Sequence, residues 1–167
     1  MICGGFRSRC GAARARSGQI AAMKQNVPVS KIMSTDPVTV HHGDPISKIR
    51  KVFVESGVHH LPVVSGEELV GILSWTDMMR ISFGDAFGNK DAFEGNQVAE
   101  DAVLDHTHKL EDVMQSEPTT IASDAPIRHA AEKLGEVEFH ALPVVEGKKL
   151  VGIVTTQDLI RYLRDLY

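Results

Sequence analysis

The sequence repeats itself once along its 167 residues, without a gap: Met33 recurs as Met114 and His59 as His140, an offset of 81 positions. The same offset matches longer runs, namely Leu-Pro-Val-Val at 61–64 with 142–145, and Leu-Val-Gly-Ile at 69–72 with 150–153. The copies occupy 29–82 and 110–163. A duplication at this period predicts two equivalent structural units and argues against any fold without internal repetition.

Hydrophobic patterning predicts the same five elements in each copy, in the order strand, helix, strand, strand, helix. In the first copy the predicted strands are 37–40, 61–64 and 69–73, and the predicted helices begin at Asp44-Pro45 and near Ser74. Apolar residues at helical spacing (Ile46, Ile49 and Phe53) define the buried face of the first helix. An aspartate directly before a proline is typical of a helix N-cap, so Asp44 is expected to cap this helix.

The size of one copy favours a single module built from both. A unit of ~50 residues buries too little apolar surface to be stable alone, and the second copy is the available partner. We therefore predict an α/β (α+β) fold, in which two strand–helix–strand–strand–helix repeats pack with pseudo-two-fold symmetry. The predicted organisation is a basic leader at 1–23, the first repeat at 24–82, an acidic crossover at 83–109 and the second repeat at 110–167.

The leader and the crossover differ from the repeats in charge. Residues 1–23 contain four arginines and no acid, so 24–167 hold 14 basic and 22 acidic residues, a net charge of −8 against −4 for the chain. The leader is compatible with a transit peptide, a basic tail, or a disordered or extraneous segment before a domain that starts at Met23; its lack of leucines favours the last. The crossover has six acids and two lysines, and we expect a surface connection that is partly helical around 98–104.

Composition and motifs exclude several classes of protein. Both cysteines, Cys3 and Cys10, fall in the leader, so the repeats hold no thiol for catalysis, disulfides or zinc. The absence of a run of about 18 apolar residues argues against a membrane protein, and the lack of a basic stripe argues against nucleic-acid binding. No P-loop, nucleophile elbow or His-Glu-x-x-His motif occurs, so no catalytic residue is expected. We expect a cytoplasmic protein that is not an enzyme.

The tandem units, with Leu-Pro-Val-Val, Leu-Val-Gly-Ile and Ser/Thr-x-x-Asp at fixed spacing, resemble the CBS (cystathionine β-synthase) domain pair, or Bateman module. The resemblance covers 29–163, nearly everything after the leader. It implies a regulatory module that binds AMP, ADP, ATP or S-adenosylmethionine in clefts between the copies and requires no cofactor. It also implies a homodimer and an effector protein, still unknown, that responds to the bound ligand.

In that family the aspartate of the Ser/Thr-x-x-Asp motif binds the ribose hydroxyls, and the hydroxyl residue lies near the phosphate. The matching positions here are Ser74 with Asp77 and Thr155 with Asp158. A carboxylate can accept two hydrogen bonds from a cis-diol, and a helix N-terminus offers N–H groups to a phosphate. The same pattern is also a capping box that only starts a helix, and both interpretations remain open.

Two other residue types extend the candidate site. Arg80 and Arg161 follow the aspartates by three residues, where they can neutralise phosphates or form an ion pair with the same aspartate. His59, His60 and His140 precede the Leu-Pro strands, where an imidazole can make ligand binding depend on pH. The resemblance adds residues from the strands of both copies: Thr39, Val40, Pro62, Thr120, Ile121, Ala141 and Pro143.

Several residues allow more than one interpretation. His106 and His108 can bind a metal, but a surface position is favoured for both, because no further ligand lies nearby in the sequence. Trp75 can stack on a base or pack in the interior. The pairs 78–79 and 159–160 are candidate dimer contacts whose ordinary role is the intramolecular core. The competing hypothesis for the whole chain is a structural dimerisation module with vestigial clefts.

Overall fold

The computed structural model of the chain describes residues 26–83, 101–136 and 140–167. The predicted leader at 1–23 and the first part of the crossover, at 84–100, lie outside the described residues.

Both copies contain the predicted order of strand, helix, strand, strand and helix, which is confirmed. The first copy comprises η1 (Val29–Lys31), β1 (Ser34–Thr35), β2 (Val40–His41), α2 (Ile46–Ser56), β3 (His60–Ser65), β4 (Glu68–Ser74) and α3 (Trp75–Phe83). After α4 (Asp101–Thr107), the second copy comprises α5 (Leu110–Val113), β5 (Gln115–Ser116), β6 (Ile121–Ala122), α6 (Ile127–Glu136), β7 (Ala141–Glu146), β8 (Lys149–Thr155) and α7 (Thr156–Arg164). The strand predicted at 37–40 is shorter than expected, because only Val40 and His41 pair with β3.

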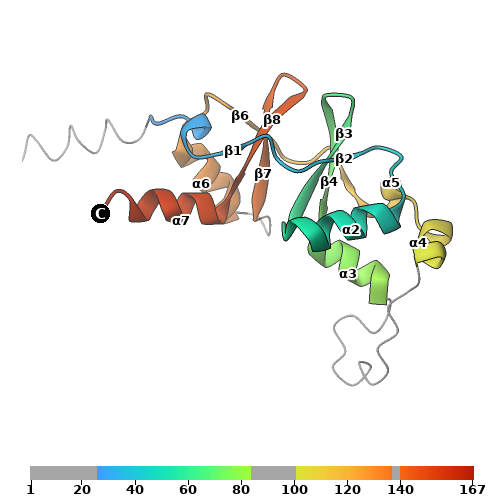
Figure 1. Ribbon diagram of the computed structural model, residues 1–167. Helices are drawn as coiled ribbons and strands as arrows, with labels where there is room; N and C mark the ends of the chain where they lie inside the picture. Colours follow the sequence, from blue (N-terminus) through green and yellow to red (C-terminus); the bar gives the residue numbers. More distant parts are fainter. Residues whose placement is uncertain (1–25, 84–100, 137–139) are drawn as a thin grey trace, which may run out of the picture.

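The strands form one mixed sheet in the order β2-β3-β4-β8-β7-β6. Within each copy the first strand is parallel to the second, and the second and third form an antiparallel hairpin. The two hairpins meet at their turns, where Glu68 pairs with Lys149. Figure 1 shows the hairpins side by side, with α2 and α3 beside one and α6 and α7 beside the other.

The segments that lead into each copy, 29–35 and 110–116, pack on the opposite copy; we call them the leading segments. β1 pairs with β8 through Ser34↔Ile153, and β5 pairs with β4 through Gln115↔Ile72. These pairings are related by the 81-residue offset, which is the pseudo-two-fold symmetry predicted from the sequence. The packing of each leading segment on the opposite copy was not predicted.

Two apolar cores stabilise the module, one beneath each hairpin. The first core contains Val40, Ile46, Ile49, Phe53, Leu61, Val63, Leu73, Met78, Leu104 and Leu110. The second core contains Val29, Ile121, Ala130, Leu134, Leu142, Val144 and Val154. Each leading segment also contributes a side chain to the core of the opposite copy. Val29 of the first leading segment lies in the second core, and Leu110 of the second leading segment lies in the first core.

The second half of the predicted crossover is not a simple surface connection. The predicted helix around 98–104 is observed as α4, Asp101–Thr107, which packs against α2. Leu104 is only 1% exposed and belongs to the first core. Asp101 of α4 forms ion pairs with Arg50 and Lys51 of α2. This part of the crossover therefore lies on the surface and is helical, and Leu104 anchors it in the first core.

The N-terminus of α2 is capped by a residue distant in sequence. Asp44 does not cap it, because its carboxylate accepts from the backbone N–H of His41 and the Nζ of Lys48 instead. The carboxylate of Asp105, in α4, accepts from the backbone N–H of Ser47 at 2.8 Å and from the Ser47 hydroxyl at 2.7 Å. These hydrogen bonds fix α4 to the start of α2 and lower the pKa of Asp105.

Replacing Asp105 with alanine is expected to reduce the free energy of unfolding by about 1 kcal/mol, because an N-cap interaction of the Ser47 N–H is lost. The folded-state pKa of Asp105 is lowered, so its stabilisation is complete above the unfolded pKa and disappears as pH falls through the folded pKa. Urea denaturation of wild type and Asp105→Ala at neutral and acid pH measures both effects. The control is Glu55→Ala, which removes an exposed carboxylate from the last turn of α2. Equal stability losses in the two variants would contradict the cap.

Candidate functional site

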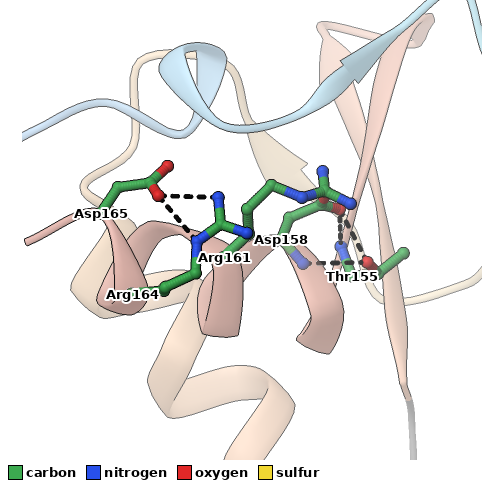
Figure 2. A network of polar contacts seen from close by, with 5 residues as sticks. All are labelled: Thr155, Asp158, Arg161, Arg164 and Asp165. Carbon is green, nitrogen blue, oxygen red and sulfur yellow. Dashed lines mark hydrogen bonds and ion pairs between the residues drawn. The ribbon is translucent and has the colours of Figure 1, made fainter.

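Both Ser/Thr-x-x-Asp motifs form helix caps. In the second copy Thr155 Oγ1 accepts from the backbone N–H of Asp158, and Asp158 Oδ2 accepts from the backbone N–H of Thr155 at 2.9 Å. Figure 2 shows this capping box at the start of α7. In the first copy Ser74 Oγ accepts from the Asp77 N–H at 3.1 Å and donates to Asp77 Oδ2 at 2.5 Å. The capping box is confirmed in the second copy, whereas the first copy shows only the cap made by the Ser74 hydroxyl; both leave a ligand role open.

The two arginines form ion pairs with these aspartates, as one of the sequence interpretations held. Arg80 Nη1 lies 3.3 Å from Asp77 Oδ1, and Arg161 Nη1 lies 3.2 Å from Asp158 Oδ1. Figure 2 shows Arg161 extending beside Asp158 along α7. Both arginine side chains are more than half exposed, so these pairs contribute little to stability.

The equivalent aspartates differ in exposure. The Asp158 side chain is 6% exposed, whereas the Asp77 side chain is 35% exposed. Their partners do not differ, because in each aspartate one oxygen accepts from the hydroxyl residue of the motif and the other from the arginine. Asp77 therefore has the more accessible carboxylate, although the two motifs are almost identical in sequence.

A cleft of about 480 Å³ lies beside Asp77, between the two copies. Its lining is His60, Ile72, Ser74, Thr76, Asp77, Val113, Met114, Gln115, Pro118, Thr119, His140, Ala141 and Pro143. One wall comes from β3, β4 and the start of α3, and another comes from the second leading segment and the residues after it. The third comes from the start of β7. The volume falls within the usual range for small-molecule sites, and the walls combine apolar and polar side chains in similar proportion.

Two histidines face this cleft from different copies. His60 is partly buried at the start of β3, and His140 is exposed directly before β7. Burial lowers the pKa of His60, and the nearby His140 and His59 lower it further, while the carboxylate of Asp77 acts in the opposite direction. The cleft thus combines a carboxylate with two imidazoles, one of which, His140, lowers the pKa of the other, His60.

The sequence profile of the family described as CBS domain matches residues 29–84 and 110–165 of the chain. The chain belongs to the CBS domain family. The two matched regions correspond to the two sequence copies, and the leading segments at 29–35 and 110–116 fall inside them.

Related CBS proteins share the fold over most of this chain. The uncharacterized protein MJ1404 of Methanocaldococcus jannaschii is 29% identical over 153 residues, which are 91% of this chain and 35% of that protein. The chain thus spans about a third of this relative's length. The CBS domain of a membrane protein from Sphaerobacter thermophilus is 28% identical with a TM-score of 0.69, and the match covers 90% of this chain and 96% of that one.

A third relative was crystallised with ligands. The CBS domain pair of protein MJ0100, in complex with 5′-methylthioadenosine and S-adenosyl-L-methionine, is 26% identical to this chain with a TM-score of 0.64. The match covers 84% of this chain and 98% of that structure.

The structure brings six of the predicted CBS ligand residues together in the cleft: His60, Ser74, Asp77, His140, Ala141 and Pro143. The remaining ten are not among the described residues that line it: Thr39, Val40, His59, Pro62, Arg80, Thr120, Ile121, Thr155, Asp158 and Arg161. Val40 and Ile121 are 2% and 4% exposed and belong to the two cores, so their side chains are occupied by packing.

Sequence reasoning missed seven lining residues: Ile72, Thr76, Val113, Met114, Gln115, Pro118 and Thr119. Five of them follow one another along the second leading segment and just beyond it. The matches of Met33 with Met114 and Pro37 with Pro118 had marked this segment as part of the repeat. Its place in the cleft depends on the pairing of β5 with β4, which the sequence repeat does not reveal.

The remaining candidate residues lie outside the cleft, either in the first core or on the surface. Trp75 packs edge-on against Phe53, with ring centroids 5.5 Å apart, and contacts the first core. Met78 is fully buried there, whereas Ile160 on α7 is 65% exposed. Within the described ranges, no group of three or more His, Cys, Asp or Glu side chains is placed to bind a metal ion. None of the helices in these ranges has the length and apolar character that spanning a membrane requires.

Proposed function

We propose that the chain is a regulatory CBS pair that binds an adenosine-containing ligand in the cleft beside Asp77. The observation that carries this proposal is the position of Asp77, whose accessible carboxylate lies in a cleft formed by both copies. An ionised carboxylate is a suitable acceptor for the two hydroxyls of a ribose. The complex of the MJ0100 pair with adenosine derivatives supports the same ligand class.

The other walls of the cleft suit the rest of such a ligand. Ile72, Val113 and Met114 offer apolar surface for an adenine ring. Thr76 lies in the first turn of α3 and offers its hydroxyl to a polar substituent on the ribose. The ligand is expected to bind without any metal or cofactor.

Binding in this position links the two copies. The lining comes from β4 of the first copy and from the segment before β6 of the second, so a bound ligand contacts both. A ligand that binds one arrangement of the copies more tightly shifts the population of molecules toward that arrangement. An effector protein then binds the favoured arrangement. Exposed Ile160 and Leu163 on α7 are the surface that we assign to a homodimer contact.

Isothermal titration calorimetry with AMP, ATP, 5′-methylthioadenosine and S-adenosylmethionine tests this function. Asp77→Asn is expected to weaken binding in the cleft at least about tenfold, because hydrogen bonds to a charged acceptor are lost. The matched control is Asp158→Asn, whose carboxylate is 6% exposed and which should leave this affinity unchanged. Absence of heat with all four ligands would favour a dimerisation module with a vestigial cleft. Unchanged affinity in Asp77→Asn would reject the ribose assignment.

A further inference from the structure

The charges that line the cleft are unusual for a site that binds a nucleotide. Asp77 is the one carboxylate among the described lining residues, and they include neither a lysine nor an arginine. Arg80 lies near the cleft, but its Nη1 forms an ion pair with Asp77 Oδ1 and its side chain is 66% exposed. The groups in the lining that can become cationic are the imidazoles of His60 and His140.

The surroundings of His60 control when it becomes charged. His59 lies directly before β3, the uncharged Ser74 of β4 is the strand partner of His60, and Asp77 of α3 faces it. His140 approaches from the second copy, and burial together with the two neighbouring histidines lowers the pKa of His60. The lining residues from 113–119 carry no charge.

The surroundings of His140 include the start of α7. The His140 carbonyl accepts from the backbone N–H of Thr156 at 3.1 Å, which places the helix beside it. The charged residues near this end of α7, Asp158 and Arg161, pair with each other. Across the cleft, His140 is close enough to His60 to lower the pKa of His60.

These charges have different consequences for different adenosine ligands. Asp77 is paired with Arg80 and histidine is mostly neutral at pH 7, so at that pH the described lining offers no unpaired cation to an incoming phosphate. A 5′-phosphate brings about two further negative charges into a cleft without a permanent cation in its described lining. A 5′-thioether is neutral and a 5′-sulfonium is positive, so neither requires a cation in the lining.

We propose that this cleft selects adenosine ligands by the charge of the 5′ substituent, accepting neutral or cationic substituents at neutral pH and a 5′-phosphate only when His60 and His140 are protonated. The inference rests on the proposed function, because it concerns the same cleft. It assigns specificity to the two imidazoles, whereas Asp77 binds the ribose that all these ligands share.

Calorimetry with 5′-methylthioadenosine and AMP at about pH 7.5 and about pH 5 tests the inference; the lower pH lies well below the reference pKa of histidine because the pKa of His60 is lowered. The thioether is expected to bind with the same affinity at both pH values. The affinity of wild type for AMP, divided by that of the His60→Gln/His140→Gln double variant, is expected to rise about tenfold or more on acidification. Taking this ratio removes the titration of the AMP phosphate itself, which is identical in both proteins.

Two further measurements make the result decisive. AMP binding to wild type should take up more protons than binding to the double variant, as measured in buffers of different ionisation enthalpy. His129→Gln, which removes an exposed histidine from α6, should behave as wild type. A ratio that does not change with pH while both ligands bind overturns the charge selection and leaves the proposed function intact. Loss of thioether binding in the double variant also overturns it, and failure of both ligands to bind wild type overturns both proposals.

Discussion

Replacing Leu104 with alanine is expected to lower the free energy of unfolding by about 2–5 kcal/mol, the usual range for a fully buried leucine. Leu104 is 1% exposed and lies in the first core, although it belongs to the segment between the two sequence copies. It is the side chain through which α4 enters that core, and Figure 1 shows α4 near one end of α2. Urea denaturation followed by circular dichroism measures the loss.

The neighbouring residue provides a matched control for this prediction. Val103 is 50% exposed on the same turn of α4, so Val103→Ala should change stability by no more than about 0.5 kcal/mol. Both substitutions shorten an apolar side chain in one helix, and they differ mainly in burial. Similar effects of the two variants would show that α4 is not part of the folded core.

Gly152→Ala is expected to destabilise the protein by about 1–3 kcal/mol, because the added methyl group has no room. A Cβ at this position would lie 2.7 Å from Met33 Sδ and 2.9 Å from the backbone oxygen of Ser34. The sulfur can move, but the Ser34 oxygen belongs to β1, which is hydrogen-bonded to β8. The substitution therefore forces the first leading segment away from the second copy, and thermal or urea denaturation detects the loss.

Two other glycines show whether contact is the cause. At Gly71 the corresponding backbone oxygen, of Gln115, lies at 3.1 Å, so Gly71→Ala should cost less than Gly152→Ala. At Gly135 in α6 nothing lies within 4 Å, and Gly135→Ala should stabilise the protein by up to about 1 kcal/mol through helix propensity. A neutral or stabilising Gly152→Ala would contradict the close approach of β1.

The sequence predicted those parts of the fold that depend on local patterns. Ile46, Ile49 and Phe53 at helical spacing identified the buried face of α2, and the 81-residue offset identified the symmetry. Contacts between distant segments were not predictable. Strands as short as β1 and β5 have no periodicity, and Asp105 reaches Ser47 across 58 positions of the sequence, so no local signal marks either contact.

The candidate site was predictable to a similar extent. The motifs identified Asp77 and Asp158 equally, because their local sequences are alike. The difference in exposure between the two carboxylates arises from the tertiary structure around them, which a motif does not encode. The histidines before the Leu-Pro strands were identified as candidates, whereas their approach to one another across the cleft followed only from the packing of the two copies.

The exchange of leading segments also bears on what the unit of folding is. Separated at the connection between the copies, each half would hold a segment that completes the other half: Val29 for the second core and Leu110 for the first. Neither half is a closed domain, and the chain is better described as a covalently tethered dimer of incomplete protomers. Duplication in one chain makes their association intramolecular, so the assembly of the cleft does not depend on protein concentration.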